Sequence, residues 1–422
     1  MLRLDTAAIS CREALVLLSQ GASGRISRLC FGRSWSVSYC MLLWIIVAAV
    51  AALAAAAPGP TLVVRGKGTA LGDLAWVGVG CRVAVLANIS EATGPDLEAL
   101  AMTGNLTEEC ANVNALGLSS DGLTAIVAMG GSPPALFTLM LEPQGQGAFH
   151  LVPGPTAFRV PDGASATRIS DAAAFNGRDV FFAAMESAND GGGVVALFAD
   201  APEPLAAQWL GAPSKVNDAR PTAGNGSVVY ATASTGLVEL AFSCGAACGG
   251  GGPSSLSLVG TLATPSVDND GLAITVDGTT AFIAAMGEGF VTVNLAGADR
   301  GACGGASVPG FSGGVASAAG DGTGSGSPTL ALVAADPGLV ALDVADPLDP
   351  LPAWSCGLGA GSGGVGWNLW VDDTRGLALV ADFDGGLQVV RFGQGSAPVA
   401  VAHFGAGALE QCTDVGGGAV VS

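Results

Sequence analysis

The apolar and polar positions of this chain follow a short pattern that returns seven times, at intervals close to fifty residues. Each copy has an aliphatic or aromatic pair, one or two alanines, a glycine or small polar turn, and then a second β-rich run. With the second residue of each pair as its anchor, the intervals are 50, 55, 48, 53, 50 and 47 residues. The anchors are Val77, Val127, Phe182, Tyr230, Ile283, Val333 and Val380. Self-similarity at this period predicts a β-propeller, with one blade for each copy.

The strands of one unit can be placed from its turns. Residues 272–276 form a first strand that ends at Asp277-Gly278, a dipeptide typical of tight hairpins. Further strands are predicted at 281–286, 290–295 and 306–308. Helical periodicity is nearly absent after residue 60, with one helical turn at most near 97–100. We therefore predict an all-β body over residues 70–422, most simply a ring of seven blades, with six or eight as the alternatives.

The end of the chain resembles the approach to one more strand. Val420 and Val421 follow three glycines, 416–418, and a strand there could pair with the first blade. Its expected partner is either residues 61–64 or the unit that contains Val77. Such pairing would close the ring and remove two exposed sheet edges.

An apolar run without interruption occupies residues 41–57, and arginines precede it. Together with residues 35–40 it is long enough to cross a bilayer, whereas its small C-terminal residues also fit a cleaved signal peptide. Residues 1–40 are then a cytoplasmic tail or a targeting peptide, and residues 58–69 a linker. Both interpretations place the propeller outside the cell, secreted or membrane-anchored. The alternative is a thylakoid lumen, reached through a transit peptide.

The charge of the chain limits its partners. The formal net charge is −19, and residues 1–40 contribute +3, so the remaining residues carry −22. An acidic surface repels nucleic acid phosphates and anionic lipid, so we expect no nucleic acid partner. Contact with the membrane is expected only through residues 41–57, and only if that segment is retained.

Two kinds of covalent modification agree with a secretory route. Asn88, Asn105 and Asn225 each begin a glycosylation acceptor triplet. Seven cysteines follow the apolar run, and in an oxidising compartment some should form disulfides. Cys244 and Cys248 are expected to close a small local loop. Cys303 and Cys356, at related distances from their anchors, are the favoured second pair.

Candidate catalytic and metal-binding residues are few. The two histidines, His150 and His403, form no paired motif, which argues against a zinc centre. Ser312 lies in a Gly-x-Ser-x-Gly match, but no strand and helix flank it as a hydrolase elbow requires. Residues 268–271 and 382–385 resemble fragments of calcium loops, although tight turns demand the same residues. No cofactor is therefore expected, with weak calcium binding as the alternative.

The last two units resemble a known repeat family. Residues 331–351, ALVAADPGLVALDVADPLDPL, and 376–394, GLALVADFDGGLQVVRFGQ, are similar to LVIVD repeats. The similarity is best over residues 330–394 and weaker elsewhere, and the aspartate of the family's Val-Ala-Asp step is present as Asp336 and Asp382. The resemblance implies a β-propeller in a secreted or cell-surface protein. It implies no single activity.

Two functions remain open from the sequence. The first is a non-enzymatic propeller that binds a protein or a glycan across one face, since loops on a rigid scaffold commonly carry specificity. The second is a propeller hydrolase or lactonase with a calcium ion in its central channel. That alternative needs carboxylates from several blades at one strand end, and only Asp336 and Asp382 occupy such a position.

Overall fold

The computed structural model describes residues 60–414, apart from short stretches between strands, of which the longest are 90–96, 319–328, 358–365 and 405–411. The chain divides into two compact units, Met1–Ala57 and Pro58–Ser422. The described residues belong to the second unit and contain no helix long and apolar enough to cross a membrane. The apolar run 41–57 lies outside the described residues.

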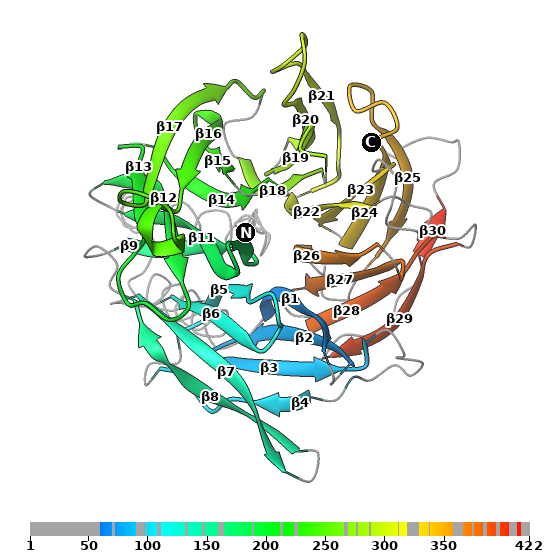
Figure 1. Cartoon of the computed structure of the whole chain (residues 1–422). Helices are drawn as coiled ribbons and strands as arrows, with labels where there is room; N and C mark the ends of the chain where they lie inside the picture. Colours follow the sequence, from blue (N-terminus) through cyan, green and yellow to red (C-terminus); the bar gives the residue numbers. More distant parts are fainter. Residues whose placement is uncertain are drawn as a thin grey trace, which may run out of the picture. The chain divides into compact units, whose positions relative to one another are not determined.

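The second unit is a ring of seven antiparallel sheets, each built from consecutive strands (Figure 1). Blade 1 contains β1 (Pro60–Thr69), β2 (Gly72–Val79), β3 (Arg82–Ala87) and β4 (Ala99–Met102). Blade 2 contains β5 (Val113–Leu118), β6 (Thr124–Met129), β7 (Ala135–Gly145) and β8 (Ala148–Ala157). Blade 3 contains β9 (Ala164–Ile169), β10 (Ala173–Phe175), β11 (Arg178–Ser187), β12 (Gly191–Phe198) and β13 (Ala206–Trp209). Strands β9 and β10 both pair with β11, so together they form one interrupted inner strand.

The remaining four blades repeat this order. Blade 4 contains β14 (Val216–Pro221), β15 (Val228–Ala233), β16 (Gly236–Ser243) and β17 (Ser255–Leu262). Blade 5 contains β18 (Asn269–Ile274), β19 (Thr280–Ala285), β20 (Gly289–Asn294) and β21 (Cys303–Ala306). Blade 6 contains β22 (Ser312–Ala318), β23 (Leu330–Ala335), β24 (Gly338–Asp343), β25 (Leu351–Cys356) and β30 (Cys412–Asp414). Blade 7 contains β26 (Gly366–Asp372), β27 (Leu377–Asp382), β28 (Gly386–Arg391) and β29 (Val399–Phe404).

The predicted seven-bladed propeller is confirmed. Each of the seven anchors lies on the second strand of a successive blade, and none is more than 4% exposed. Their burial explains the period, because each blade must contribute the same apolar stripe to the interface with its neighbour. Helical structure among the described residues is limited to short 3-10 turns such as η2 (Gly245–Cys248). The helical turn expected near residues 97–100 is instead the start of β4.

The hairpin between the first two strands is specified locally. In blade 5 the hydroxyl of Thr275 donates to Oδ1 of Asp277 at 2.5 Å, and the amide of Thr279 donates to the same oxygen at 3.1 Å. Gly278 follows with φ of 71°, which favours glycine. Residues 119–124 of blade 2 make the same turn with serine in place of the first threonine. The Asp-Gly dipeptides thus mark the hairpin that the sequence predicted.

The ring closes by side-chain packing between blades 7 and 1. Buried apolar residues of β2, β3, β27, β28 and β29 form one cluster, which includes Val77, Leu86, Leu379 and Val389. A main-chain hydrogen bond from Leu97 to the carbonyl of His403 adds to this junction at 2.8 Å. Strand β1 also lies beside β26 of blade 7.

The last described strand of the chain does not join blade 1. Residues 412–414 form β30, which pairs with β25 on the outer edge of blade 6 and not with blade 1. Residues 60–69 form the inner strand of blade 1, β1. The assignment of residues 58–69 as a linker is therefore wrong over residues 60–69. Val420 and Val421, at which the closing strand was expected, lie outside the described residues, so their pairing with blade 1 stays a prediction.

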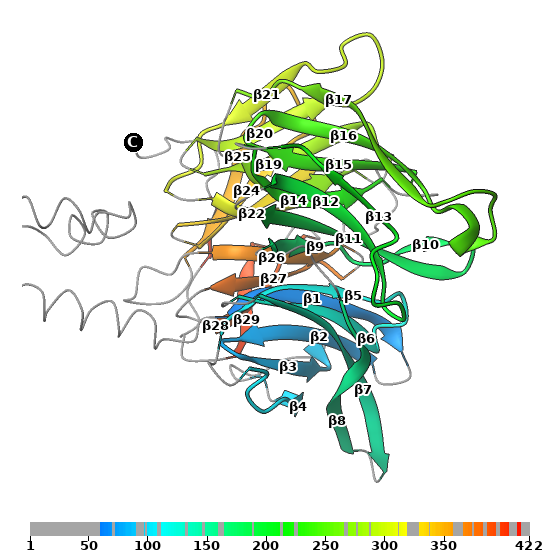
Figure 2. The same ribbon diagram turned by 90° about the vertical axis from the view of Figure 1, so that its left-hand side faces the viewer.

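One hairpin breaks the regularity of the ring. Strands β7 and β8 have 11 and 10 residues, and their hairpin projects beyond the rest of blade 2 (Figure 2). His150 and Glu142 pair on this hairpin, with 3.9 Å between Nε2 and Oε2. His150 therefore lies on a projecting hairpin and not near the axis of the ring.

Candidate functional site

A β-bulge recurs on the inner strand of blades 2 to 7. In each case the inner strand has one extra residue that has no partner on the second strand. The extra residue is the second of the inner strand in five blades and the fourth in blade 3. The extra residues are Asn114, Thr167, Asn217, Asp270, Gly313 and Trp367. A bulge leaves a residue unpaired and redirects its polar groups, and bulges are common beside functional sites.

Hydroxyl groups satisfy carbonyl oxygens that these bulges release. The Thr167 hydroxyl lies 3.1 Å from the carbonyl oxygen of Val216 and 3.2 Å from that of Asn217, in the next blade. The Thr232 hydroxyl lies 3.2 Å from the carbonyl oxygen of Asp270, again one blade further on. Both threonines therefore link adjacent blades through the bulges, because a buried carbonyl without a donor is costly.

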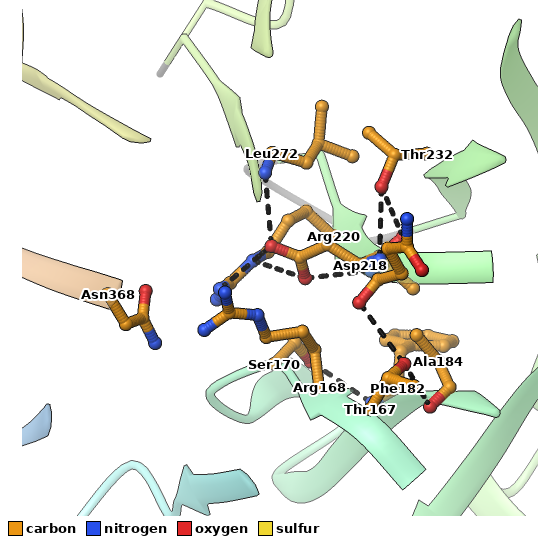
Figure 3. A network of polar contacts seen from close by, with 12 residues as sticks. Thr167, Arg168, Ser170, Phe182, Ala184, Asp218, Arg220, Thr232, Leu272 and Asn368 are labelled. Carbon is orange, nitrogen blue, oxygen red and sulfur yellow. Dashed lines mark hydrogen bonds and ion pairs between the residues drawn. The ribbon is translucent and has the colours of Figure 1, made fainter. Parts of the chain in front are cut away.

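Arg168 extends from blade 3 to blades 5 and 6. Its Nη2 donates to the carbonyl oxygen of Gly313, the bulge residue of blade 6, at 3.0 Å. The same nitrogen lies 3.7 Å from Oδ2 of Asp270, and the Arg168 side chain is only 3% exposed. Figure 3 shows the guanidinium directed toward Asn368 of blade 7. One buried cation thus contacts two other blades, 5 and 6.

Asp218 and Arg220 form a second charged pair on β14. Asp218 is 2% exposed, and its Oδ1 lies 3.1 Å from Nε of Arg220. Oδ1 also accepts from the amide of Ala219 at 2.8 Å, and Oδ2 accepts from the amide of Leu272 at 3.1 Å (Figure 3). The carboxylate therefore has donors on both oxygens, and one of those donors belongs to the next blade. Hydrogen bonds to an ionised carboxylate are about twice as strong as neutral ones.

Two glycines just after the bulges of blades 5 and 6 lie in close contact with the next blade. A Cβ on Gly271 would lie 2.7 Å from the carbonyl oxygen of Gly313, and a Cβ on Gly314 would lie 2.8 Å from Cα of Asn368. These contacts are too short for any side chain, so only glycine fits at positions 271 and 314. We call Arg168, Asp218, Arg220, Asp270 and Asn368 the axial cluster.

The axial cluster joins inner strands of blades 3, 4, 5 and 7. It holds two cations and two carboxylates, so its net formal charge is zero. Four of its five members are at most 9% exposed, and Arg220 keeps 29% of its side chain exposed. With its charges balanced and both oxygens of Asp218 engaged by donors, the arrangement is suited to fixing the blades relative to one another.

The axial cluster was not predicted from the sequence, although the sequence contains a signal for it. The bulge residue lies 13 positions before the anchor in blades 2, 4, 5 and 7, as Asn114, Asn217, Asp270 and Trp367. In blades 3 and 6 longer connections shift this interval, to 15 for Thr167 and 20 for Gly313. Counting back from each anchor would have located four of the six bulges.

Ser312 joins two blades. Its hydroxyl lies 3.1 Å from the carbonyl oxygen of Ala285 and 2.9 Å from that of Gly289, and the residue is completely buried. Ser312 starts β22 in blade 6, whereas both acceptors flank the β19–β20 turn of blade 5. A serine nucleophile must be accessible and hydrogen-bonded to a base. Ser312 is therefore a link between blades, as the absence of a flanking helix in the sequence indicated.

The two calcium-loop fragments fall at different places. Asp270 is a bulge residue beside Arg168, so a cation already lies next to its carboxylate. Asp382 ends β27, and residues 383–385 lie outside the described residues. Among the residues that the structure describes, no group of three or more histidine, cysteine, aspartate or glutamate side chains could hold a metal ion. Asp336 follows β23 in the turn before β24.

Two of the three predicted glycosylation sites, Asn88 and Asn105, have exposed side chains. Asn88 follows β3 with φ of 55°, and its side chain faces solvent. Asn105 follows β4, also exposed, and its Oδ1 accepts a hydrogen bond from Nε of Arg82 at 3.1 Å. Asn225 lies outside the described residues. Glycosylation of all three stays a prediction.

Of the two predicted disulfides, one is formed and the other is not. Cys244 and Cys248 form a disulfide with 5.6 Å between their Cα atoms, in the loop after β16. Cys303 is a free thiol, whereas Cys356 is disulfide-bonded, so the expected Cys303–Cys356 bridge is not formed. Cys303 begins its outer strand and Cys356 ends the corresponding strand of the next blade. The two therefore lie at opposite ends of neighbouring strands. The residue across the ladder from Cys356 is Cys412 on β30.

Comparisons with known proteins bear on the fold. No protein-family model and no curated protein matches the chain. Among solved structures, Sqt1 from Chaetomium thermophilum aligns with a TM-score of 0.53 at 13% identity, over 84% of this chain and 84% of that one. The periplasmic gluconolactonase PpgL of Pseudomonas aeruginosa aligns with a TM-score of 0.51 at 14% identity, over 85% of this chain and 99% of that one. At such low identity these similarities support the propeller fold alone.

Proposed function

We propose that this protein is a non-enzymatic binding module of the secretory pathway, in which a rigid ring of blades presents its loops to a protein or glycan partner. The observation that carries this proposal is the engagement of the axial cluster with protein groups. Arg168 binds a carbonyl oxygen and Asp270, while both oxygens of Asp218 accept hydrogen bonds. The polar centre of the ring thus stabilises the scaffold.

Catalysis would place other demands on these residues. A general base needs an oxygen within hydrogen-bond reach of a substrate proton, and a catalytic carboxylate commonly has a neighbourhood that tunes its pKa toward neutrality. Asp218 is 2% exposed and receives an amide from the next blade, so a substrate atom would have to displace structural donors. Specificity in such a protein would reside in the loops at the two ends of the strands.

Asn88 and Asn105 support the location outside the cytoplasm. Both side chains are exposed and are therefore accessible to a glycosyltransferase. With the predicted apolar run at 41–57, they favour a secreted or membrane-anchored protein. The similarity of residues 330–394 to LVIVD repeats, which we retain as a proposal, agrees with a cell-surface setting.

A second candidate function is a propeller lactonase. The similarity to a periplasmic gluconolactonase over 85% of this chain makes lactones the first substrate class to test. A calcium ion at Asp270 does not fit the described residues, because the Arg168 guanidinium lies 3.7 Å from that carboxylate. If calcium held the ring instead, a chelator would lower the melting temperature of the full-length chain.

The binding function can be tested with the full-length chain on arrays of glycans and of extracellular protein domains. We expect saturable binding of at least one class, with the ligand recovered chemically unchanged by mass spectrometry. A matched Asp218→Asn variant should retain binding if it is folded, since this residue supports the ring from within. Recovery of a hydrolysed ligand, at a rate above that of the buffer, would contradict the proposal.

A further inference from the structure

The outer strand of blade 4 differs from those of the other blades. Strand β17 has eight residues and contains neither proline nor a charged residue, and it pairs only with β16 among the described strands. Figure 1 shows it on the outer rim of the ring. A long neutral edge strand presents unpaired main-chain groups that another strand can bind.

Features of the other six outer strands limit such pairing. Strands β4, β13 and β21 have four residues each, and β8 carries Pro153 and Pro155. Strand β30 covers the edge of β25, and Leu97 donates to the carbonyl of His403 on β29. Short strands, prolines, bulges and covering segments are among the devices by which natural sheets protect their edges. Within the described part of the chain, β17 is neither short nor covered by a further strand and carries no proline, and its one such feature is a bulge at Val259.

Two large apolar side chains are exposed at the middle of β17. Leu258 is 51% exposed and Val259 is 58% exposed. A bulge explains why consecutive residues both face solvent: Glu239 pairs with Gly260 and Leu240 with Leu258, so Val259 is the extra residue. A partner that covered both side chains would remove their apolar surface from water, which contributes favourable free energy to binding.

We propose that β17 mediates a two-fold symmetric dimer of this chain. The eight residues of β17 are centred between Leu258 and Val259, so antiparallel pairing about a two-fold axis places Leu258 of one copy opposite Val259 of the other. The same surface of each copy is buried, which closes the assembly at two subunits. A strand partner of another sequence would lack this built-in match of apolar centres.

Charge also favours a second copy at this place. Residues 240–267 contain no charged residue, whereas the chain after residue 40 carries a net charge of −22. Glu239 of the neighbouring strand β16 forms an ion pair with Arg300 that is neutral overall. Two copies would therefore repel one another over most of their surfaces and least along β17. Salt screens that repulsion, since the Debye length is only about 8 Å at physiological ionic strength.

The test is the molar mass of the full-length protein by light scattering over a wide range of concentration. We expect a dimer in the wild type, and a shift of the equilibrium toward dimer as salt is raised. Val259→Lys should give a monomer, because antiparallel pairing would desolvate two lysines near the axis. Val399→Lys is the matched control: Val399 is 53% exposed on another outer strand, and this variant should remain dimeric. Ser257→Lys should also dissociate the dimer, and because Ser257 is an exposed polar residue of β17 this change leaves the core intact.

Three outcomes would overturn the proposal. A wild-type protein that stays monomeric at the highest concentration has no such interface. A dimer that survives both lysine substitutions on β17 is formed elsewhere, for example through the apolar run at 41–57. Open-ended oligomers would contradict the two-fold closure. Wild type and variants should be compared in a Cys303→Ser background, because the free thiol of Cys303 could otherwise link copies covalently.

Discussion

Replacement of Arg168 by methionine tests how much the axial cluster contributes to stability. The substitution keeps an unbranched apolar stem but removes the guanidinium. The carbonyl oxygen of Gly313 then loses a donor at 3.0 Å, and the carboxylate of Asp270 loses a cation at 3.7 Å. Removal of one partner from a buried ion pair commonly destabilises a protein by about 3–5 kcal/mol, because the remaining charge stays buried.

An exposed ion pair of nearly the same length provides the matched control. Lys215 and Glu186 are 3.6 Å apart, but their side chains are 63% and 42% exposed, against 3% and 12% for Arg168 and Asp270. Solvent screens the exposed pair, so Lys215→Met should cost only about 0–1 kcal/mol. The two variants differ mainly in burial, which isolates the effect of desolvation.

Equilibrium unfolding in urea, followed by tryptophan fluorescence, measures both variants. We expect the unfolding midpoint to fall strongly for Arg168→Met and hardly at all for Lys215→Met. Addition of Asp270→Asn to Arg168→Met should restore part of the loss, since that change removes the unpaired buried charge. If Arg168→Met cost no more than the surface variant, the account of Arg168 as a link between blades would be wrong.

Further predictions concern single contacts and modifications. Ser312→Ala should lower the free energy of unfolding by about 1–2 kcal/mol, because two buried carbonyl oxygens lose the one hydroxyl donor that they share, and urea titration measures it. The hydrogen bond from the Thr275 hydroxyl lowers the pKa of Asp277 below its usual value. The Asp277 carboxylate therefore stabilises the fold fully at a pH above its pKa in the unfolded chain, which is near 4. This stabilisation is lost as the pH falls through the lower pKa of Asp277 in the folded chain. Asp277→Asn should therefore flatten the acid limb of the melting temperature against pH; an unchanged limb would contradict the role of this turn. In a secretory host, Asn88→Gln and Asn105→Gln should each remove the mass of one N-glycan, and unchanged masses would show that these triplets are not used.

The repeating part of the fold was predictable because burial imposes a periodic apolar pattern. Each anchor, such as Val77 or Ile283, must fill the interface between two blades, so the anchor spacing indicated the blade number. The turn at Asp277-Gly278 was predictable for a local reason, since its side-chain hydrogen bonds span only a few residues. Both signals are contained within one unit of the repeat.

The features that the sequence did not reveal depend on contacts between distant segments. Strand β1 is part of blade 1, but residues 60–69 carry no anchor pair, so they resembled a linker. Strand β30 has three residues and pairs 56 positions away, with Cys412 opposite Cys356. The same limit explains the wrong cysteine pair: equal distances from an anchor do not fix which end of the outer strand a residue occupies.

The axial cluster was hidden for a related reason. Arg168 acts on Gly313, which is 145 residues away, and no local pattern connects the two. Connections of unequal length also change the interval between bulge and anchor, as in blades 3 and 6. The number of blades could therefore be derived from the sequence, whereas the contacts that fix their centre required the structure.

The central claim is that the charged centre of the ring supports the scaffold and does not act on a substrate. Hydrolysis of gluconolactone by the full-length protein, measured with and without calcium, tests this most directly. We predict the same rate as in buffer alone under both conditions. The account would be contradicted if the wild-type protein accelerated hydrolysis and Asp218→Asn or Asp270→Asn abolished that acceleration. The circular dichroism spectrum of the variant must stay unchanged, so that unfolding does not explain the loss.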